Sequence, residues 1–326
     1  MAVLPSTKAT PSTLWPMAST SKAFTAAAMG ILLQNHPRLN WQTPISSILP
    51  EDFILADPTT TSLVNIEDAL SHRTGLPRHD TAIGLVDKDG KHPSLKQTTQ
   101  LLRYLPANAP VRIKYEYANL PFIVVARMIE MLSSKTFPAY IKENILQPLG
   151  MEHTYLRRAD AETSGATFAQ GYRYSEDDGF GAIGDMCLDD FDGAGSQISC
   201  IQDYLKWVKA LLSCKEPITP ELRKELFTPR INVDDGFDRK DAFTGPLFYA
   251  LGWVTGIYRG YRFWTHGGGS FAFGANVIVI PDLNWASVAA GNTAGSANSM
   301  IESLQWWLVD EKLGIPREER FDYLSK

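Results

Sequence analysis

Cysteine is scarce in this chain, and the few cysteines that occur show no pairing pattern. The 326 residues include only Cys187, Cys200 and Cys214, and none of them belongs to a CxxC pair. An odd number of cysteines without such pairs is typical of free thiols in a reducing compartment, not of a disulfide framework. We therefore expect the protein to be cytoplasmic.

Net positive charge and long apolar runs are also lacking. The chain has 31 lysines and arginines against 36 aspartates and glutamates, a formal net charge of −5. This balance argues against nucleic acid or an anionic membrane as the main partner. No apolar run approaches the ~20 residues that span a bilayer, and the N-terminus lacks the basic and apolar regions of a secretory signal. We expect no membrane span and no nucleic-acid partner.

Histidines at metal-ligand spacing are absent as well, so we expect no metal and no cofactor. The histidines are His36, His72, His79, His92, His153 and His266. His72 is predicted to have a structural, hydrogen-bonding role. The remaining composition, 44% hydrophobic and 21% charged, is that of a globular protein with enough apolar material for one large domain or two intimate ones.

The most informative stretch is residues 15–33, WPMASTSKAFTAAAMGILL, which predicts a helix with no wet face. Between Lys8 and Arg38, Lys22 is the only Asp, Glu, Lys or Arg, and Ser19 precedes it by three residues. On a helix that spacing places both side chains on the same face. An amine in apolar surroundings has a depressed pKa, and a neutral amine can deprotonate a neighbouring hydroxyl. The alternative is an exposed lysine after an N-cap serine, because S-x-x-K is common by chance.

Apolar periodicity predicts an α+β protein with helices first and an antiparallel meander near the end. Residues 78–95 and 228–245 are expected to be irregular and to rim a cleft. The predicted helices are 20–35, 65–70, 120–132, 137–146, 199–212 and 299–311, and the predicted strands are 249–255, 261–265, 275–280 and 286–290.

Two further segments bear on Ser19. Residues 115–119, YEYAN, form a polar corner before a predicted helix, where the alternative is a packed tyrosine and an asparagine cap. Residues 265–270, THGGGS, lie between two predicted strands, where the alternative is a flexible turn. Three glycines beside a strand let a ligand approach the backbone and its N–H groups.

Taken in order, the three segments resemble the S-x-x-K, Y-x-N and [KH]-x-G motifs of serine β-lactamases and penicillin-binding proteins. The chain is similar to the class C-like branch in particular, which includes D-aminopeptidases, serine esterases and fungal polyketide transesterases. The resemblance runs from about Leu14 to the last helix. It rests on 19–22, 117–119 and 266–268, and on LSHRTGLP at 70–77, QPLGM at 147–151 and GAGSQIS at 193–199.

The resemblance implies a mechanism. Ser19 would attack a carbonyl carbon, and Lys22 and Tyr117 would share the removal of its proton, with Tyr117 later protonating the leaving group. Asn119 would orient Lys22 and the substrate. The backbone N–H groups of Ser19 and Gly269 would form the oxyanion hole. His266, Gly267 and Gly268 would bind the substrate.

The chain departs from the pattern at two places. His266 stands where enzymes acting on carboxylate-bearing substrates usually have lysine, and Gly267 replaces a hydroxyl residue. A mostly neutral histidine anchors a carboxylate less well, which favours esters or thioesters with an apolar acyl part. Only 18 residues precede Ser19, fewer than the resemblance implies, so we expect a shortened N-terminal part. An exposed sheet edge would then be covered by the last helix or by a second copy in a homodimer, unless the sequence itself is truncated.

The implied fold is β-lactamase/transpeptidase-like: an antiparallel sheet flanked by helices, plus a mostly helical subdomain, with the active site at their junction. We expect the sheet domain to comprise residues 1–33 and 160–326, and the helical subdomain 34–159. The leading hypothesis is a serine hydrolase of ester type with a small-molecule substrate. The alternatives are an acyltransferase that passes the acyl group to a small-molecule acceptor, a non-catalytic binding protein, and a β-lactamase or D-amino peptidase.

Overall fold

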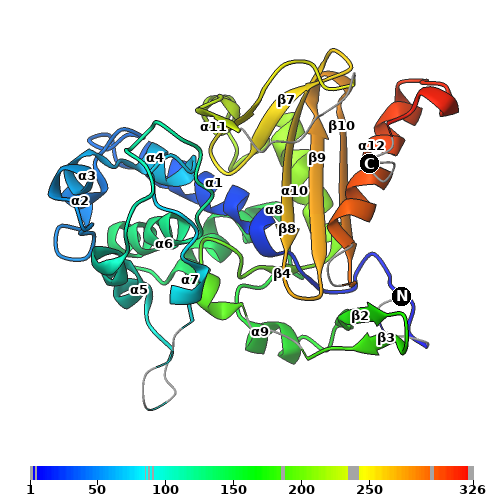
Figure 1. Cartoon of the computed structure of the whole chain (residues 1–326), viewed down its shortest axis with the longest axis horizontal. Coiled ribbons are helices and arrows are strands. Elements are labelled where there is room, and N and C mark those ends of the chain that lie inside the picture. The colour runs from blue at the N-terminus through cyan, green and yellow to red at the C-terminus, as the bar shows by residue number, and fades with distance from the viewer. Residues whose placement is uncertain are drawn as a thin grey trace.

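The structure is a computed structural model that describes residues 3, 6–84, 86, 89, 92–184, 188–233, 242–293 and 297–321. Its main feature is a six-stranded antiparallel sheet in the order β10-β9-β8-β7-β6-β5 (Figure 1). The strands of this sheet are β5 (Ile231–Val233), β6 (Leu247–Tyr249), β7 (Val254–Tyr258), β8 (Tyr261–Gly269), β9 (Gly274–Ile280) and β10 (Trp285–Gly291). Two small pairs complete the strands: β1 (Trp15–Pro16) with β4 (Ile198–Ser199), and β2 (Tyr172–Ser175) with β3 (Gly179–Ala182).

Most of the helices lie in the first half of the chain, and α10, α11 and α12 follow later; together they flank the sheet (Figure 1). They are α1 (Ser21–Gln34), α2 (Ile45–Ile48), α3 (Pro58–Leu63), α4 (Ile66–Leu70), α5 (Leu95–Leu101), α6 (Leu120–Ser133), α7 (Phe137–Ile141), α8 (Gln147–Leu149), α9 (Arg158–Thr163), α10 (Ile201–Ser213), α11 (Pro220–Phe227) and α12 (Ala297–Lys312). None of the helices within the described ranges is long and apolar enough to cross a membrane.

The sheet is covered on both faces, because the side chains of β9 pack alternately into two different apolar clusters. All seven residues of β9 are buried. Ile278 and Ile280 pack in one apolar cluster with Trp306 of α12, whereas Val277 and Val279 belong to the main core around α1 and α10. Because successive side chains of a strand point to opposite faces, α12 covers one face of β9 and the main core covers the other.

Helix α1 lies between the sheet and the helical part of the chain (Figure 1). Its residues from Ser21 to Leu33 are all buried, as its all-round apolar sequence predicts. It contacts α6 and α7 on the helical side and α11 near the sheet. A helix surrounded in this way is a rigid support for whatever side chains its first turn presents.

The α+β class and the antiparallel sheet are confirmed, and the predicted helices occur with ends shifted by a few residues. The helix predicted over 137–146 changes its hydrogen bonding within its length, because α7 is followed by a π-helical turn, Lys142–Leu146. Strand β10 forms one edge of the sheet, and α12 packs against this strand. The homodimer that was expected to cover an exposed sheet edge stays a prediction. The division into residues 1–33 with 160–326 and 34–159 also stays a prediction.

Two predictions about the end of the chain are wrong. The single strand over 249–255 is two strands, because Gly252, with φ of +74°, turns the chain between β6 and β7. Gly267–Gly269 form the end of β8 and not the flexible turn that was the alternative, because pairing with β9 outweighs the low strand preference of glycine. The stretch 228–245, predicted as irregular, contains β5, although 234–241 lies outside the described residues.

The loop predicted over 78–95 is irregular where it is described, apart from a short 3₁₀ helix, Asp80–Ala82, and the start of α5. Residues 85, 87, 88, 90 and 91 of this segment lie outside the described part of the chain.

Candidate active site

Ser19 lies in a 3₁₀ turn, Ala18–Thr20, between β1 and α1. Ala18 has a backbone φ of +46°, a left-handed conformation that residues other than glycine rarely adopt. This conformation costs roughly 1–2 kcal/mol. Side-chain hydrogen bonds hold the turn: Thr20 Oγ1 donates to the Met17 carbonyl at 2.9 Å, and Ser21 Oγ donates to the Ala18 carbonyl at 2.6 Å. This strained turn leaves Ser19 partly exposed at the N-terminal end of a buried helix.

The Lys22 amine is fully buried and has three oxygen neighbours. Nζ lies 3.1 Å from Ser19 Oγ, 2.7 Å from Asn119 Oδ1 and 2.8 Å from the Ala194 carbonyl oxygen. Burial lowers the pKa of Lys22 well below its usual value of 10.5, with a smaller contribution from the Arg78 charge. A neutral amine has two N–H groups and one lone pair. The two carbonyl oxygens take the N–H groups, so the lone pair faces Ser19 Oγ.

Tyr117 reaches the same hydroxyl from the helical side. Its hydroxyl donates to Ser19 Oγ at 2.8 Å. Burial raises the pKa of Tyr117 to about 12, so near neutral pH the group is a phenol and a proton donor. The centroid of the Tyr117 ring lies 4.2 Å from the centroid of the His72 ring. Lys22 Nζ lies 4.9 Å from the centroid of the Tyr117 ring. Of the two groups predicted to share the base role, this environment favours Lys22 as the base and Tyr117 as the acid.

Strand β8 brings the glycine segment to Ser19. A Cβ atom on Gly268 would lie 2.3 Å from the Met17 carbonyl oxygen and 3.3 Å from Ser19 N, so only glycine permits this approach. Ser270 and Phe273 exchange two backbone hydrogen bonds, which makes the next pair, Gly269 with Gly274, a non-bonded pair. The Gly269 N–H therefore points away from β9. β7 pairs with β8 only as far as Thr265, so within the described residues no strand pairs with the β7 side of Gly267–Gly269.

The two histidines near Ser19 are buried and neutral. His266 Nδ1 lies 2.6 Å from the Gly267 carbonyl oxygen, which can only accept, so Nδ1 carries the proton and Nε2 accepts from the Tyr249 hydroxyl at 2.8 Å. His72 Nδ1 accepts from the Ala118 N–H at 3.2 Å, as expected of a structural histidine. Burial lowers the pKa of His266 to about 3 and that of His72 well below 6.5. His266 therefore brings no positive charge to the site.

Acid is expected to destabilise the protein through these two histidines. The pKa values of these histidines are depressed in the folded state, so below about pH 6.5 the unfolded chain binds more protons than the folded one. The free energy of unfolding therefore decreases as the pH is lowered. The slope from each histidine is about 1.4 kcal/mol per pH unit. Urea unfolding of the wild type and of His266→Gln between about pH 7 and pH 5 measures this slope. An equal slope in both proteins would contradict the assignment.

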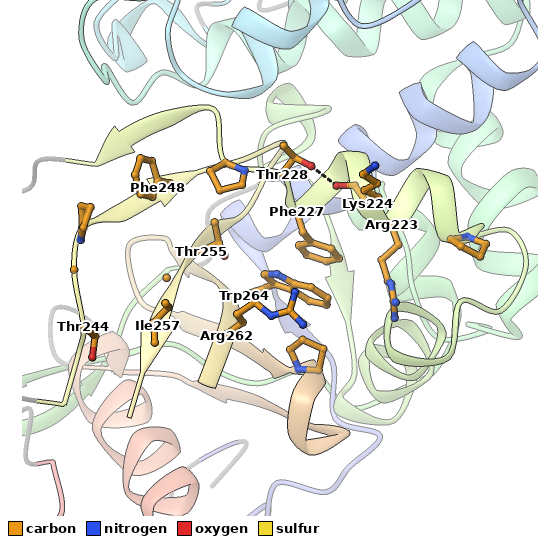
Figure 2. Close-up of a pocket in the computed structure, with 16 residues that line it drawn as sticks. Arg223, Lys224, Phe227, Thr228, Thr244, Phe248, Thr255, Ile257, Arg262 and Trp264 are labelled. Carbon is orange, nitrogen blue, oxygen red and sulfur yellow. Dashed lines mark hydrogen bonds between the residues drawn. The ribbon is translucent and has the colours of Figure 1, made fainter. Parts of the chain in front are cut away.

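The hollow in front of Ser19 has a volume of about 330 Å³ and is lined mainly by aromatic and small residues. Tyr115, Tyr249 and Val254 contribute apolar surface, and Arg78 is the charged residue on its wall. A second hollow of about 700 Å³ lies between α11 and β6–β8 and is lined by Phe227 and Trp264 among others (Figure 2). The residues that line it include no serine, cysteine or histidine.

The structure brings Ser19, Lys22, Tyr117 and Asn119 together, with the glycine strand beside them. Asn119 occupies the N-cap position of α6, but its side chain makes no capping hydrogen bond and contacts Lys22 and Asp80 instead. Sequence reasoning missed three parts of the site. The Ala194 carbonyl lies in the quoted GAGSQIS segment, but a backbone acceptor has no side-chain signal. Asp80 and Tyr249 lie in segments that were expected to be a loop and a plain strand.

Comparison with known proteins finds a family model and curated relatives that match most of the chain. The model of the Beta-lactamase family matches residues 3–308. Unguisins hydrolase ungD' of Aspergillus campestris is 39% identical over 328 residues, which cover 99% of this chain and 60% of that protein. The chain thus spans 60% of the length of this curated relative.

Two solved structures share the fold. The octameric penicillin-binding protein homologue from Pyrococcus abyssi superposes with a TM-score of 0.81 at 22% identity, covering 96% of this chain and 69% of that one. The D-amino acid amidase from Ochrobactrum anthropi superposes with a TM-score of 0.69 at 19% identity, covering 90% and 80%. At these identities the similarity shows the architecture alone.

Proposed function

Because the chain belongs to the Beta-lactamase family, we propose that it is a serine hydrolase that works through an acyl-enzyme on Ser19. One observation carries the proposal. The Ser19 hydroxyl lies 3.1 Å from a buried amine and 2.8 Å from a phenol, which gives it a base and an acid within hydrogen-bond reach. Serine is a poor nucleophile unless an adjacent base is present, and Lys22 supplies that base.

The reaction begins with attack of Ser19 Oγ on the carbonyl carbon while its proton passes to Lys22 Nζ. The negative charge that develops on the carbonyl oxygen is held by the N–H groups of Ser19 and Gly269, each of which contributes about 3–4 kcal/mol to lowering the barrier. The bond to the leaving group then breaks, and Tyr117 gives that group its proton. Lys22 returns a proton to Tyr117. Water attacks the acyl-enzyme by the reverse sequence and regenerates the Ser19 hydroxyl.

The substrate that fits this cleft is an ester or thioester with an apolar acyl part. His266 is neutral and already bonded to Tyr249, so it offers no cation to a substrate carboxylate. Arg78 is paired with Asp80 at 2.9 Å. Tyr115, Tyr249 and Val254 offer apolar contact instead. Unguisins, named in the description of the fungal relative, are the natural compounds to assay first.

Trapping the acyl-enzyme tests the proposal. We expect protein mixed with p-nitrophenyl butyrate and quenched with acid to carry one butyryl group on the tryptic peptide that contains Ser19, with butyrate released on longer incubation. The measurement is mass spectrometry of the intact protein and its peptides. An adduct on another residue, or turnover with no adduct at Ser19 at any quench time, would contradict the proposal. Preferential transfer of the butyryl group to an added alcohol would identify an acyltransferase instead of a hydrolase.

A further inference from the structure

Asp80 is connected to the base through a single residue. Its Oδ1 accepts a hydrogen bond from Asn119 Nδ2 at 2.9 Å, and Asn119 Oδ1 in turn lies 2.7 Å from Lys22 Nζ. Asp80 begins the short 3₁₀ helix in the loop at the cleft, and its Oδ2 accepts from Arg78 Nε at 2.9 Å. The order along this row is therefore guanidinium, carboxylate, amide and amine.

The chemistry of this row fixes the direction of the amide. A carboxylate can only accept hydrogen bonds, so the end of the Asn119 side chain that faces Asp80 has to be the NH₂ group. The opposite end, which faces Lys22, is then the carbonyl oxygen. With the amide reversed, two oxygens would meet at the Asp80 end, and an N–H group would point at the Lys22 amine.

We propose that Asp80 is a positioning residue that holds the Asn119 amide with its oxygen toward Lys22, and thereby keeps the Lys22 lone pair directed at Ser19. The Ala194 carbonyl takes one N–H of the neutral amine, and the correctly oriented Asn119 oxygen takes the other. A reversed Asn119 would donate into the lone pair that has to receive the serine proton. Asp80 does not touch the reacting atoms, and this inference rests on the proposed acyl-enzyme function.

The charge of Asp80 has a second, opposing effect that the test has to separate. A carboxylate near Lys22 favours the protonated amine and raises its pKa, whereas burial and Arg78 lower it. The titratable and charged groups around Lys22 are Arg78, Asp80, His72, Tyr117 and His266. Removal of the Asp80 charge alone would move the acid limb of the pH–rate profile to lower pH without lowering the plateau. Loss of amide orientation lowers the plateau itself.

The experiment compares the rate of Ser19 labelling by a fluorophosphonate probe, and kcat and KM for p-nitrophenyl butyrate, across a pH series. In Asp80→Asn the new amide can pair with Asn119 in either direction, so we expect the plateau kcat to fall about ten- to a hundredfold with little change in KM. Asp80→Glu, which keeps an acceptor-only group, should recover most of the loss. Asp282→Asn is the matched control, because Asp282 is also about one-third exposed and paired with an arginine, Arg262, on the second hollow (Figure 2).

The exchanged double variant Asp80→Asn with Asn119→Asp tests whether Asp80 orients the Asn119 amide or only stabilises the loop in which it lies. It keeps a hydrogen bond between the two positions but places the carboxylate beside Lys22, which favours the protonated amine. We expect no recovery of kcat and an acid limb shifted to higher pH. Recovery to near the wild-type rate would overturn the inference, because the role of Asp80 would then be only to stabilise the loop around residues 78–84. A plateau in Asp80→Asn within about twofold of wild type would also overturn it. Failure of the wild type to label at Ser19 would instead refute the proposed function.

Discussion

Ser19→Ala is expected to abolish covalent labelling by a fluorophosphonate probe and to lower the hydrolysis of p-nitrophenyl butyrate by about 10⁴-fold or more. The physical reason is that the variant lacks the oxygen that forms the acyl bond and that Lys22 and Tyr117 both contact. Labelling is measured by gel fluorescence and intact mass, and hydrolysis by release of p-nitrophenol. The fold should be retained, because Ser19 is partly exposed and the turn is held by Thr20 and Ser21.

Ser62→Ala is the control for this substitution. Ser62 lies in α3, is exposed, and its hydroxyl bonds only the nearby Thr59 carbonyl among the described contacts. This variant should label and turn over like the wild type. Labelling that persists in Ser19→Ala would mean that another residue is the nucleophile.

Lys22→Met is expected to lower kcat/KM by about a hundredfold or more, the usual contribution of a positioned general base. Methionine retains much of the apolar stem but has no basic lone pair with which to receive the serine proton. The alternative base, Tyr117, is protonated near neutral pH, because its pKa is raised to about 12 and its hydroxyl already donates to Ser19. The measurement is steady-state kinetics across pH, together with the rate of probe labelling at Ser19.

Lys135→Met provides a matched control, since Lys135 is an exposed lysine paired with Glu143 and lies outside the site. Circular dichroism of both variants checks that the fold is kept. A Lys22→Met enzyme that works at a near-normal rate would show that the proton takes another path.

The local parts of the site could be predicted from the sequence. Ser19 and Lys22 are one helical turn apart, so their proximity follows from helix geometry, and the burial of Lys22 follows from the apolar stretch around it. Tyr117 and His266 lie far from Ser19 in sequence, and they were placed near it only through the order of the three motifs. The structure then brings Tyr117 into direct contact with Ser19.

The remaining parts depend on long-range contacts that leave no local pattern. Asp80 meets Asn119 across 39 residues, from a loop whose sequence is simply polar. The Ala194 carbonyl is a backbone group and is defined only by the path of its loop. A flexible turn was the alternative for residues 265–270, but six residue pairs with β9 and close contact with the Ser19 turn extend the strand through the three glycines.

The central claim concerns one buried amine: Lys22 is neutral in the resting enzyme and accepts a proton from the hydroxyl of Ser19. The direct measurement is an NMR titration of lysine ε-carbons in protein labelled with carbon-13 at lysine, with the Lys22 signal assigned from its absence in Lys22→Met. Burial of Lys22, which outweighs the opposing effect of the Asp80 charge, predicts that this signal titrates well below the usual 10.5 and reports a neutral amine near neutral pH. A Lys22 signal that titrates together with those of the exposed lysines would contradict the claim.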